Sequence, residues 1–410
     1  VAIGNEALEN NVAAENVAVG TKALRANTSG TQNVAVGTEA LKTMTTTEGQ
    51  TAVGWKALEL SVGNYNTAIG TECMNDATGA GNCTGVGYHA LRLLTTGAQN
   101  TALGMQALYS NTDGARNLAI GYNAYSSSNS ENDNLAIGFD AMTTNTAGGT
   151  GNVAVGNYAM DELTSGDYNT AIGYSSMHKL TTGLRNTGIG YLGGQFITTG
   201  DDNVCINGGP ALTTGDKNVM VGYQSGNNTQ DGLRNTLVGY GAGFNVTSGD
   251  NNLIIGFEAG QAGSPGGAIS TANNIISLGD ENIATCNIQV DWTVASDKRD
   301  KTDVEPVKMG LDFVNKLEPV TYQWDKRSKY GDKTADDYDL NAIVPDGTHK
   351  EDWKDVGFLA QDVEKLEEEY GHKISDKTNL TTTLSGDEKQ YGLTYAKFVP
   401  ILTKAIQELS

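Results

Sequence analysis

The feature that most constrains the fold of this chain is a short apolar run that ends in glycine and recurs almost every 16 to 18 residues. Most runs read NTAIG, NVAVG or a close variant. One run reads NVCIN, so Asn207 takes the glycine position, and Asn is the other residue that best tolerates a positive φ. A fixed period of this length predicts a repeat architecture. The glycines that end the runs are Gly4, Gly20, Gly37, Gly54, Gly70, Gly87, Gly104, Gly121, Gly138, Gly156, Gly173, Gly190, Gly222, Gly239 and Gly256.

Each repeat predicts two short strands separated by turns. The run before the glycine alternates apolar positions and is closed by a turn residue, which is typical of a strand. A second apolar pair, such as Ala40-Leu41, begins three residues after the glycine and precedes a turn such as TTGDKN. A repeat of about 17 residues is too short for a helical unit. We therefore predict a mainly β chain, in which each repeat is one coil of a β-solenoid or β-roll and pairs with the next coil.

The small size of each coil predicts self-association. We expect a core of one Ala, one Ile or Val, and one Leu or Met in each coil. About seventeen coils at a strand spacing of roughly 4.8 Å would form a rod on the order of 80 Å long. Exposed strand edges and a thin core favour a bundle of identical chains. The repeats from Val1 to about Gly260 resemble the β-roll heads of trimeric autotransporter adhesins, which implies a homotrimer.

Charge density marks a domain boundary. Residues 1–290 contain 33 charged side chains, whereas residues 291–410 contain 42, and four of the six prolines also lie in this shorter part. We therefore predict a solenoid over residues 1–290 and a smaller α+β domain over residues 291–410, which ends in a helix.

Composition argues against several classes of function. The net charge of −21 argues against nucleic-acid binding through phosphates. We find no signal peptide and no apolar run of 18 residues, so we expect no membrane insertion. We expect no metal and no cofactor, and no Ser-His-Asp triad, because the four histidines are dispersed. The acids are scattered singly among the turns, so the sequence indicates no paired-carboxylate catalytic site. The cysteines lack CxxC spacing and are interpreted as unpaired structural thiols: Cys73, Cys83, Cys205 and Cys286.

Two sets of repeat positions could bind ligands. The Asn before each strand is interpreted as a stacked amide ladder that satisfies turn backbone, rather than as a metal or sugar ligand. The aromatic residue after the glycine has two interpretations, a packing ladder or an exposed stripe that contacts a receptor or glycan. The members of this aromatic stripe are Trp55, Tyr88, Tyr122, Phe139, Tyr174, Tyr191, Tyr223, Tyr240 and Phe257.

The segment ASDKRDKTDVE, which begins at Ala295, lies between the two parts of the chain. It is followed by GFLAQDV at residues 357–363 and by YGLTYAKFVPILTKAIQEL at residues 391–409. In their order and in their amino-acid sequence, these three segments resemble the endosialidase-type intramolecular chaperone found at the C-terminus of many phage tail fibres and tailspikes. The resemblance covers about residues 295–410.

The resemblance implies a domain that trimerises, helps the preceding β-structure to fold and then cuts itself off. The family pattern S-D-x-R-x-K places the catalytic pair at Ser296 and Lys301, with Asp297 and Arg299 as supporting residues. A lysine can activate a serine when burial or nearby cations lower the lysine pKa, and Arg299 and its neighbour Lys298 are the nearby cations. Attack on the carbonyl of Ala295 would cut the Ala295–Ser296 bond, with the Ser296–Asp297 bond as the alternative.

The C-terminal part predicts mixed secondary structure. Helical spacing appears at residues 307–317, 360–370 and 395–409, and residues 319–325 predict a strand. In the family the last helix leads into a long helical bundle. Because this chain stops at Ser410 and begins inside a repeat at Val1, we expect a fragment of a longer fibre or a short tail.

Three functions are compatible with the sequence. The first is the distal part of a phage tail fibre, assembled in the host cytoplasm and carried in the virion. Such a fibre would bind a bacterial surface glycan or an outer-membrane receptor, and its only enzymatic activity would be a single-turnover serine endopeptidase that cuts its own chain. The alternatives are a bacterial trimeric surface adhesin and a tailspike that degrades polysaccharide.

Overall fold

The computed structural model describes residues 1–144, 148–289, 292–331 and 338–410. The chain forms two compact units, Val1–Asn252 and Leu253–Ser410. The domain boundary predicted between residues 290 and 291 lies outside the described residues. The first unit contains the strands β1 (Ala2–Ile3), β2 (Val17–Val19), β3 (Val34–Val36), β4 (Thr51–Val53), β5 (Thr67–Ile69), β6 (Thr84–Val86), β7 (Thr101–Leu103), β8 (Leu118–Ile120), β9 (Leu135–Ile137), β10 (Val153–Val155), β11 (Thr170–Ile172), β12 (Thr187–Ile189), β13 (Val204–Ile206), β14 (Val219–Val221) and β15 (Thr236–Val238).

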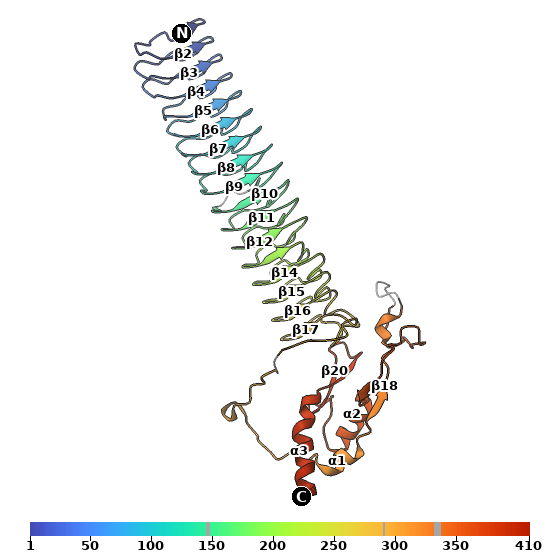
Figure 1. Ribbon diagram of the computed structural model, residues 1–410. Coiled ribbons are helices and arrows are strands. Elements are labelled where there is room, and N and C mark those ends of the chain that lie inside the picture. Colours follow the sequence, from blue (N-terminus) through green and yellow to red (C-terminus); the bar gives the residue numbers. More distant parts are fainter. Residues whose placement is uncertain (145–147, 290–291, 332–337) are drawn as a thin grey trace. The chain divides into compact units, whose positions relative to one another are not determined.

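These strands pair in parallel with the equivalent strand one coil away. In the pairing of β3 with β4, Val34 lies opposite Thr51 and Val36 lies opposite Val53. Figure 1 shows the coils of the first unit stacked in sequence order. The predicted mainly β solenoid of about 17-residue coils is therefore confirmed.

The glycine that ends each strand allows the coils to stack closely. Gly37 has a φ of 138°, and a Cβ atom built on it would lie 2.3 Å from the carbonyl oxygen of Gly54 in the next coil. An L-residue with a side chain is strained at this φ and has no room there. Asn207 occupies the equivalent position with a φ of 50°, which confirms that Asn meets the need for a positive φ by adopting the left-handed helical conformation.

The prediction of a second strand in each coil is wrong. The segment after the glycine is a run of turns, in which Glu39 and Leu41 have φ values of 63° and 49°. Its backbone still bonds to the next coil, because the N–H of Leu41 donates to the carbonyl of Ala57 at 3.1 Å. Alternating positive φ values prevent an extended strand but keep this inter-coil ladder.

The predicted core composition is also partly wrong. The middle residue of each strand points inward, and in β3 this residue is Ala35, which is fully buried. Ala40, Leu41 and Met44 from the same coil are fully buried as well. Val34 and Val36 of β3 lie on the outer face, because successive side chains of a strand point to opposite sides. The Ile or Val expected inside each coil is therefore outside.

The Asn before each strand forms the predicted amide ladder. The backbone N–H of Asn33 donates to Oδ1 of Asn16 at 3.0 Å, and Nδ2 of Asn33 donates to the carbonyl of Thr47 at 2.9 Å. Gln50 and Cys83 take the Asn position in two coils. These side chains are committed to backbone groups, so the structural interpretation is confirmed. The amide members of the ladder are Asn16, Asn33, Asn66, Asn100, Asn117, Asn134, Asn152, Asn169, Asn186, Asn203, Asn218, Asn235 and Asn252.

The four cysteines are free. Cys73, Cys83 and Cys205 are buried, whereas Cys286 is exposed. Burial raises the pKa of the Cys73 and Cys205 thiols to about 12, so both thiols stay protonated at neutral pH.

The second unit is a mixture of short strands and helices. It contains two antiparallel strand pairs, β18 with β19 and β20 with β21, and a parallel pair, β16 with β17. The predicted strand and the three predicted helices are present, and the chain ends in α3. The elements are β16 (Leu253–Ile255), β17 (Ile276–Leu278), η1 (Lys298–Asp300), α1 (Leu311–Lys316), β18 (Val320–Tyr322), η2 (Arg327–Lys329), β19 (Asp355–Gly357), α2 (Ala360–Glu369), β20 (Thr382–Leu384), β21 (Tyr391–Leu393), η3 (Tyr395–Lys397) and α3 (Phe398–Leu409).

A small core joins the three α-helices. It contains Met309, Phe313, Val363, Leu366, Phe398 and Ile401. Beside this core, the buried Glu367 of α2 accepts hydrogen bonds from the backbone N–H and the hydroxyl of Thr381, at 2.6 and 2.7 Å. It also accepts a hydrogen bond from the hydroxyl of Thr382. Burial alone would raise the pKa of Glu367, but these hydrogen bonds lower it below its ordinary value.

Among the described residues, the structure has no helix with the length and apolar character needed to cross a membrane.

Candidate self-cleavage site

A short turn brings Ser296 and Lys301 together. Nζ of Lys301 donates to Oγ of Ser296 at 2.6 Å. The turn η1 lies between them, and the backbone N–H of Lys301 donates to the carbonyl of Lys298 at 3.3 Å. The five-residue spacing of the predicted pair is therefore compatible with direct contact between hydroxyl and amine.

Asp297 caps this turn. Its backbone is extended, with φ −66° and ψ 132°, and its Oδ1 accepts a hydrogen bond from the backbone N–H of Arg299 at 2.9 Å. Asp is a favoured residue at the start of a helical turn, because its carboxylate satisfies an N–H group that has no partner within the turn. The side chain of Asp297 thus holds the backbone that separates Ser296 from Lys301.

Arg299 pairs with Asp297. Nη2 of Arg299 lies 2.6 Å from Oδ2 of Asp297, and Nε lies 3.1 Å from both carboxylate oxygens. The side-chain hydrogen bond from Arg299 lowers the pKa of Asp297, and the same contact raises the pKa of Arg299. Arg299 is expected from the sequence to help activate Lys301, but its charge is largely offset by this pairing with Asp297.

The reacting groups are exposed in the single chain. Ala295, Ser296 and Lys301 are all exposed. A lysine amine can accept the proton of a serine only when it is neutral, and an ordinary lysine is charged at neutral pH. Removal of the site from water would favour the neutral amine. In the described segment, the hydroxyl and the amine are therefore in contact, and both are open to solvent.

The aromatic stripe lies on the surface of the coils. The exposed fractions of its nine side chains run from 40% at Phe139 to 69% at Tyr191. Neighbouring members also contact one another, since Tyr122 and Phe139 stack at 5.2 Å between ring centroids and Tyr174 and Tyr191 stack at 5.8 Å. The rings are thus both stacked and available to a ligand, and neither interpretation excludes the other.

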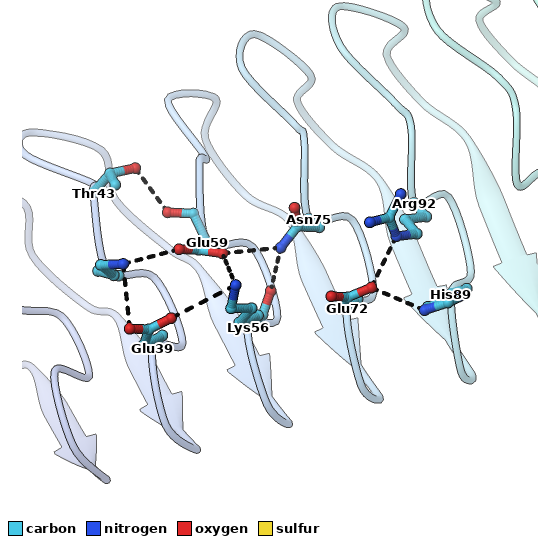
Figure 2. A network of polar contacts seen from close by, with 9 residues as sticks. Glu39, Thr43, Lys56, Glu59, Glu72, Asn75, His89 and Arg92 are labelled. Atoms are coloured by element: carbon cyan, nitrogen blue, oxygen red, sulfur yellow. Dashed lines mark hydrogen bonds and ion pairs between the residues drawn. The ribbon is translucent and has the colours of Figure 1, made fainter.

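The first unit carries a network of polar side chains that was not predicted from the sequence. Figure 2 shows Lys56 and the carboxylates of Glu39 and Glu59 on neighbouring coils. Nζ of Lys42 lies 3.1 Å from Glu59 and 3.3 Å from Glu39. Nδ2 of Asn75 donates to Glu59 at 3.3 Å. Burial alone would raise the pKa of Glu59, but the hydrogen bonds from Lys42 and Asn75 lower it below its ordinary value.

A second group in Figure 2 repeats the pattern. Nε2 of His89 and Nε of Arg92 each lie 2.9 Å from the same carboxylate oxygen of Glu72. These acids are scattered singly in the sequence, but in space each one contacts basic side chains. The signal that could have found these pairs is opposite charge at a separation of about one coil, as for Lys42 and Glu59, which are 17 residues apart. Within the described ranges, no group of three His, Cys, Asp or Glu residues could hold a metal ion.

Comparison with protein families gives a match that begins at the Ser296 of this site. Residues 296–372 match the chaperone of endosialidase. We call these residues the chaperone segment. The match includes the GFLAQDV motif at residues 357–363, and the closing motif at residues 391–409 lies beyond it. Comparisons with curated proteins and with solved structures gave no significant match.

Proposed function

We propose that this chain is the distal part of a phage tail fibre, which is folded and trimerised with the help of its chaperone segment and is then released from it by one cut at Ser296. The observation that carries the proposal is the 2.6 Å contact between Lys301 and Ser296 at the first residue of the family match. A β-solenoid followed by such a segment fits a tail-fibre or tailspike protein better than a surface adhesin. The virion is the corresponding location.

The cleavage proceeds in two steps, formation of an ester and its hydrolysis. Lys301 accepts the hydroxyl proton of Ser296 as Oγ attacks the carbonyl carbon of Ala295. The peptide C–N bond breaks, the proton passes to the leaving amine of Ser296, and an ester joins Ala295 to Oγ. Water then opens the ester, which yields a carboxylate at Ala295 and a free hydroxyl and amine at Ser296.

Exposure of the pair couples the cut to assembly. Because the pair is exposed in the single chain, burial by neighbouring chains is the simplest source of a neutral lysine. A cut that follows trimerisation also leaves the fibre kinetically stable, because the segment that helped it to fold has left.

Contact with the host is assigned to the aromatic stripe. Exposed aromatic faces suit the apolar faces of sugar rings, and two stacked pairs of this stripe, Tyr122 with Phe139 and Tyr174 with Tyr191, each join neighbouring coils. The proposed ligand is a bacterial surface glycan or an outer-membrane receptor.

Intact-mass spectrometry of the freshly expressed chain tests the cleavage. We expect two fragments that meet at the Ala295–Ser296 bond, and a single uncut chain for Ser296→Ala and Lys301→Ala. Lys308→Ala is the matched control, because Lys308 is an exposed lysine of the same segment with no assigned part in the cut, and this variant should still cut. An uncut parent chain, or a cut that persists in Lys301→Ala, would contradict the proposed mechanism.

A further inference from the structure

The outer face of the first unit's sheet carries no charged or amide side chain in the strands from β2 to β15, all of which the structure describes. Each of these fourteen strands presents two residues on this face, its first and its third. The first residue is always Val, Thr or Leu, and the third is always Val, Ile or Leu. We call these 28 residues the outer sheet face.

No residue of the outer sheet face is buried in the single chain: its members are half-buried or exposed. Leu103 is 47% exposed and Ile172 is 41% exposed, whereas the middle residues of the same strands, Ala102 and Ala171, are fully buried. Parallel sheets are normally covered on both faces. Here the turns of each coil cover the inner face, and nothing in the described part of the coils covers the outer one.

Charge is kept on other parts of the coil. The Arg116–Asp133 and Arg185–Asp202 pairs lie at the position before the ladder Asn. The network around Glu59 lies in the turns after the glycine. A chain with a net charge of −21 thus leaves one long face free of charged side chains. Monomeric soluble proteins rarely expose a large continuous apolar patch.

We propose that the outer sheet face is where copies of this chain pack against one another along the fibre. The proposal rests on the homotrimer of the proposed function and assigns its contact surface in the solenoid. The partner is a parallel second copy, because only a chain with the same coil spacing can match an apolar residue at every coil.

Size and charge both agree with this partner. A stable interface takes roughly 20 to 30 residues from each side, and the outer sheet face offers 28. Two copies can approach through this face without opposing their net negative charges directly, because the charged ladders lie elsewhere on the coil.

Cysteine cross-linking of the full chain tests the assignment. The background is Cys286→Ser, since Cys286 is the exposed cysteine and the other three are buried. Leu103→Cys and Ile172→Cys place a thiol on the outer sheet face. Val62→Cys and Phe196→Cys are the matched controls, because Val62 is 54% exposed and Phe196 is 44% exposed but neither lies in a strand.

A short bismaleimide should link each of Leu103→Cys and Ile172→Cys into covalent dimers, with roughly tenfold more product than the controls, since packed copies raise the effective concentration of the thiols. Equal linking of face and control variants, or linking of the controls alone, would overturn the assignment. So would a chain that light scattering shows to be monomeric. The same gels score the cut at Ser296, so a chain that cuts itself but does not link through this face refutes the assignment and leaves the proposed cleavage intact.

Discussion

The backbone N–H of Asn117 donates to Oδ1 of Asn100, one coil earlier, at 2.9 Å, and both side chains are buried. The same contact recurs along the first unit and is weakest at Cys83. There the backbone N–H of Asn100 reaches Sγ at 3.4 Å, and Sγ lies 3.4 Å from the carbonyl of Gly97. Sulfur is a poorer partner than an amide for both groups.

Restoring the ladder should therefore stabilise the solenoid. Cys83→Asn is expected to increase the free energy of unfolding by about 1 kcal/mol, because two weak sulfur contacts become amide hydrogen bonds. The reverse change, Asn117→Cys, should lower it by a similar amount. Denaturant unfolding followed by circular dichroism measures both. A destabilised Cys83→Asn variant would show that the site has no room for the amide.

The network around Glu59 makes the first unit sensitive to acid. The pKa of Glu59 is lowered in the folded state, so its contribution is present above the unfolded pKa and is lost as the pH falls through the folded pKa. We expect stability to fall between about pH 5 and pH 3 and expect Glu59→Gln to reduce this fall. Thermal unfolding midpoints across this range measure it. The exposed Asp231 supplies the control Asp231→Asn, and an equal reduction in that variant would refute a specific role for Glu59.

The cap formed by Asp297 should set the cleavage rate. Asp297→Ala removes the acceptor for the Arg299 N–H and should slow the cut roughly fivefold, as expected for the loss of a cap worth about 1 kcal/mol. Asp297→Asn keeps a good cap but loses the ion pair with Arg299, so it should cut at close to the parent rate. Quantitative mass spectrometry over time measures both rates. If Asn slows the reaction as much as Ala, the charge of Asp297 matters and the cap does not.

The buried carboxylate of Glu367 should stabilise the second unit. Glu367→Ala leaves the N–H and hydroxyl groups of Thr381 and the hydroxyl of Thr382 without their acceptor and should cost about 3 kcal/mol. Amide hydrogen exchange should then quicken in α2 and β20. Glu368→Ala is the matched control, because Glu368 is the exposed neighbour in the same helix. Unchanged exchange in Glu367→Ala would show that the carboxylate adds no stability.

Local pattern explains which features the sequence could predict. The coil period, the strand before each glycine and the three helices all follow from residues close together in the chain. The prediction of a second strand is wrong because Leu41 has a φ of 49°, and non-glycine residues with bulky side chains rarely adopt positive φ. The neighbouring coils hold Leu41 in this conformation, which no local propensity reveals.

By itself, the sequence determined the repeating coil, because hydrogen-bonded turns act over short lengths of chain. The resemblance to the chaperone family, rather than any local pattern, pointed to Ser296 and Lys301. Only the tertiary structure decided which side of each strand is buried, which charges meet across coils and that Glu367 bonds to Thr381. These relationships depend on residues far apart in the sequence, whose contacts form only when the coils stack and the helices pack. The outward position of Val34 and Val36 is the clearest case, since the strand fixes their alternation but the packing of the coil, which buries Ala35, Leu41 and Met44, fixes the direction.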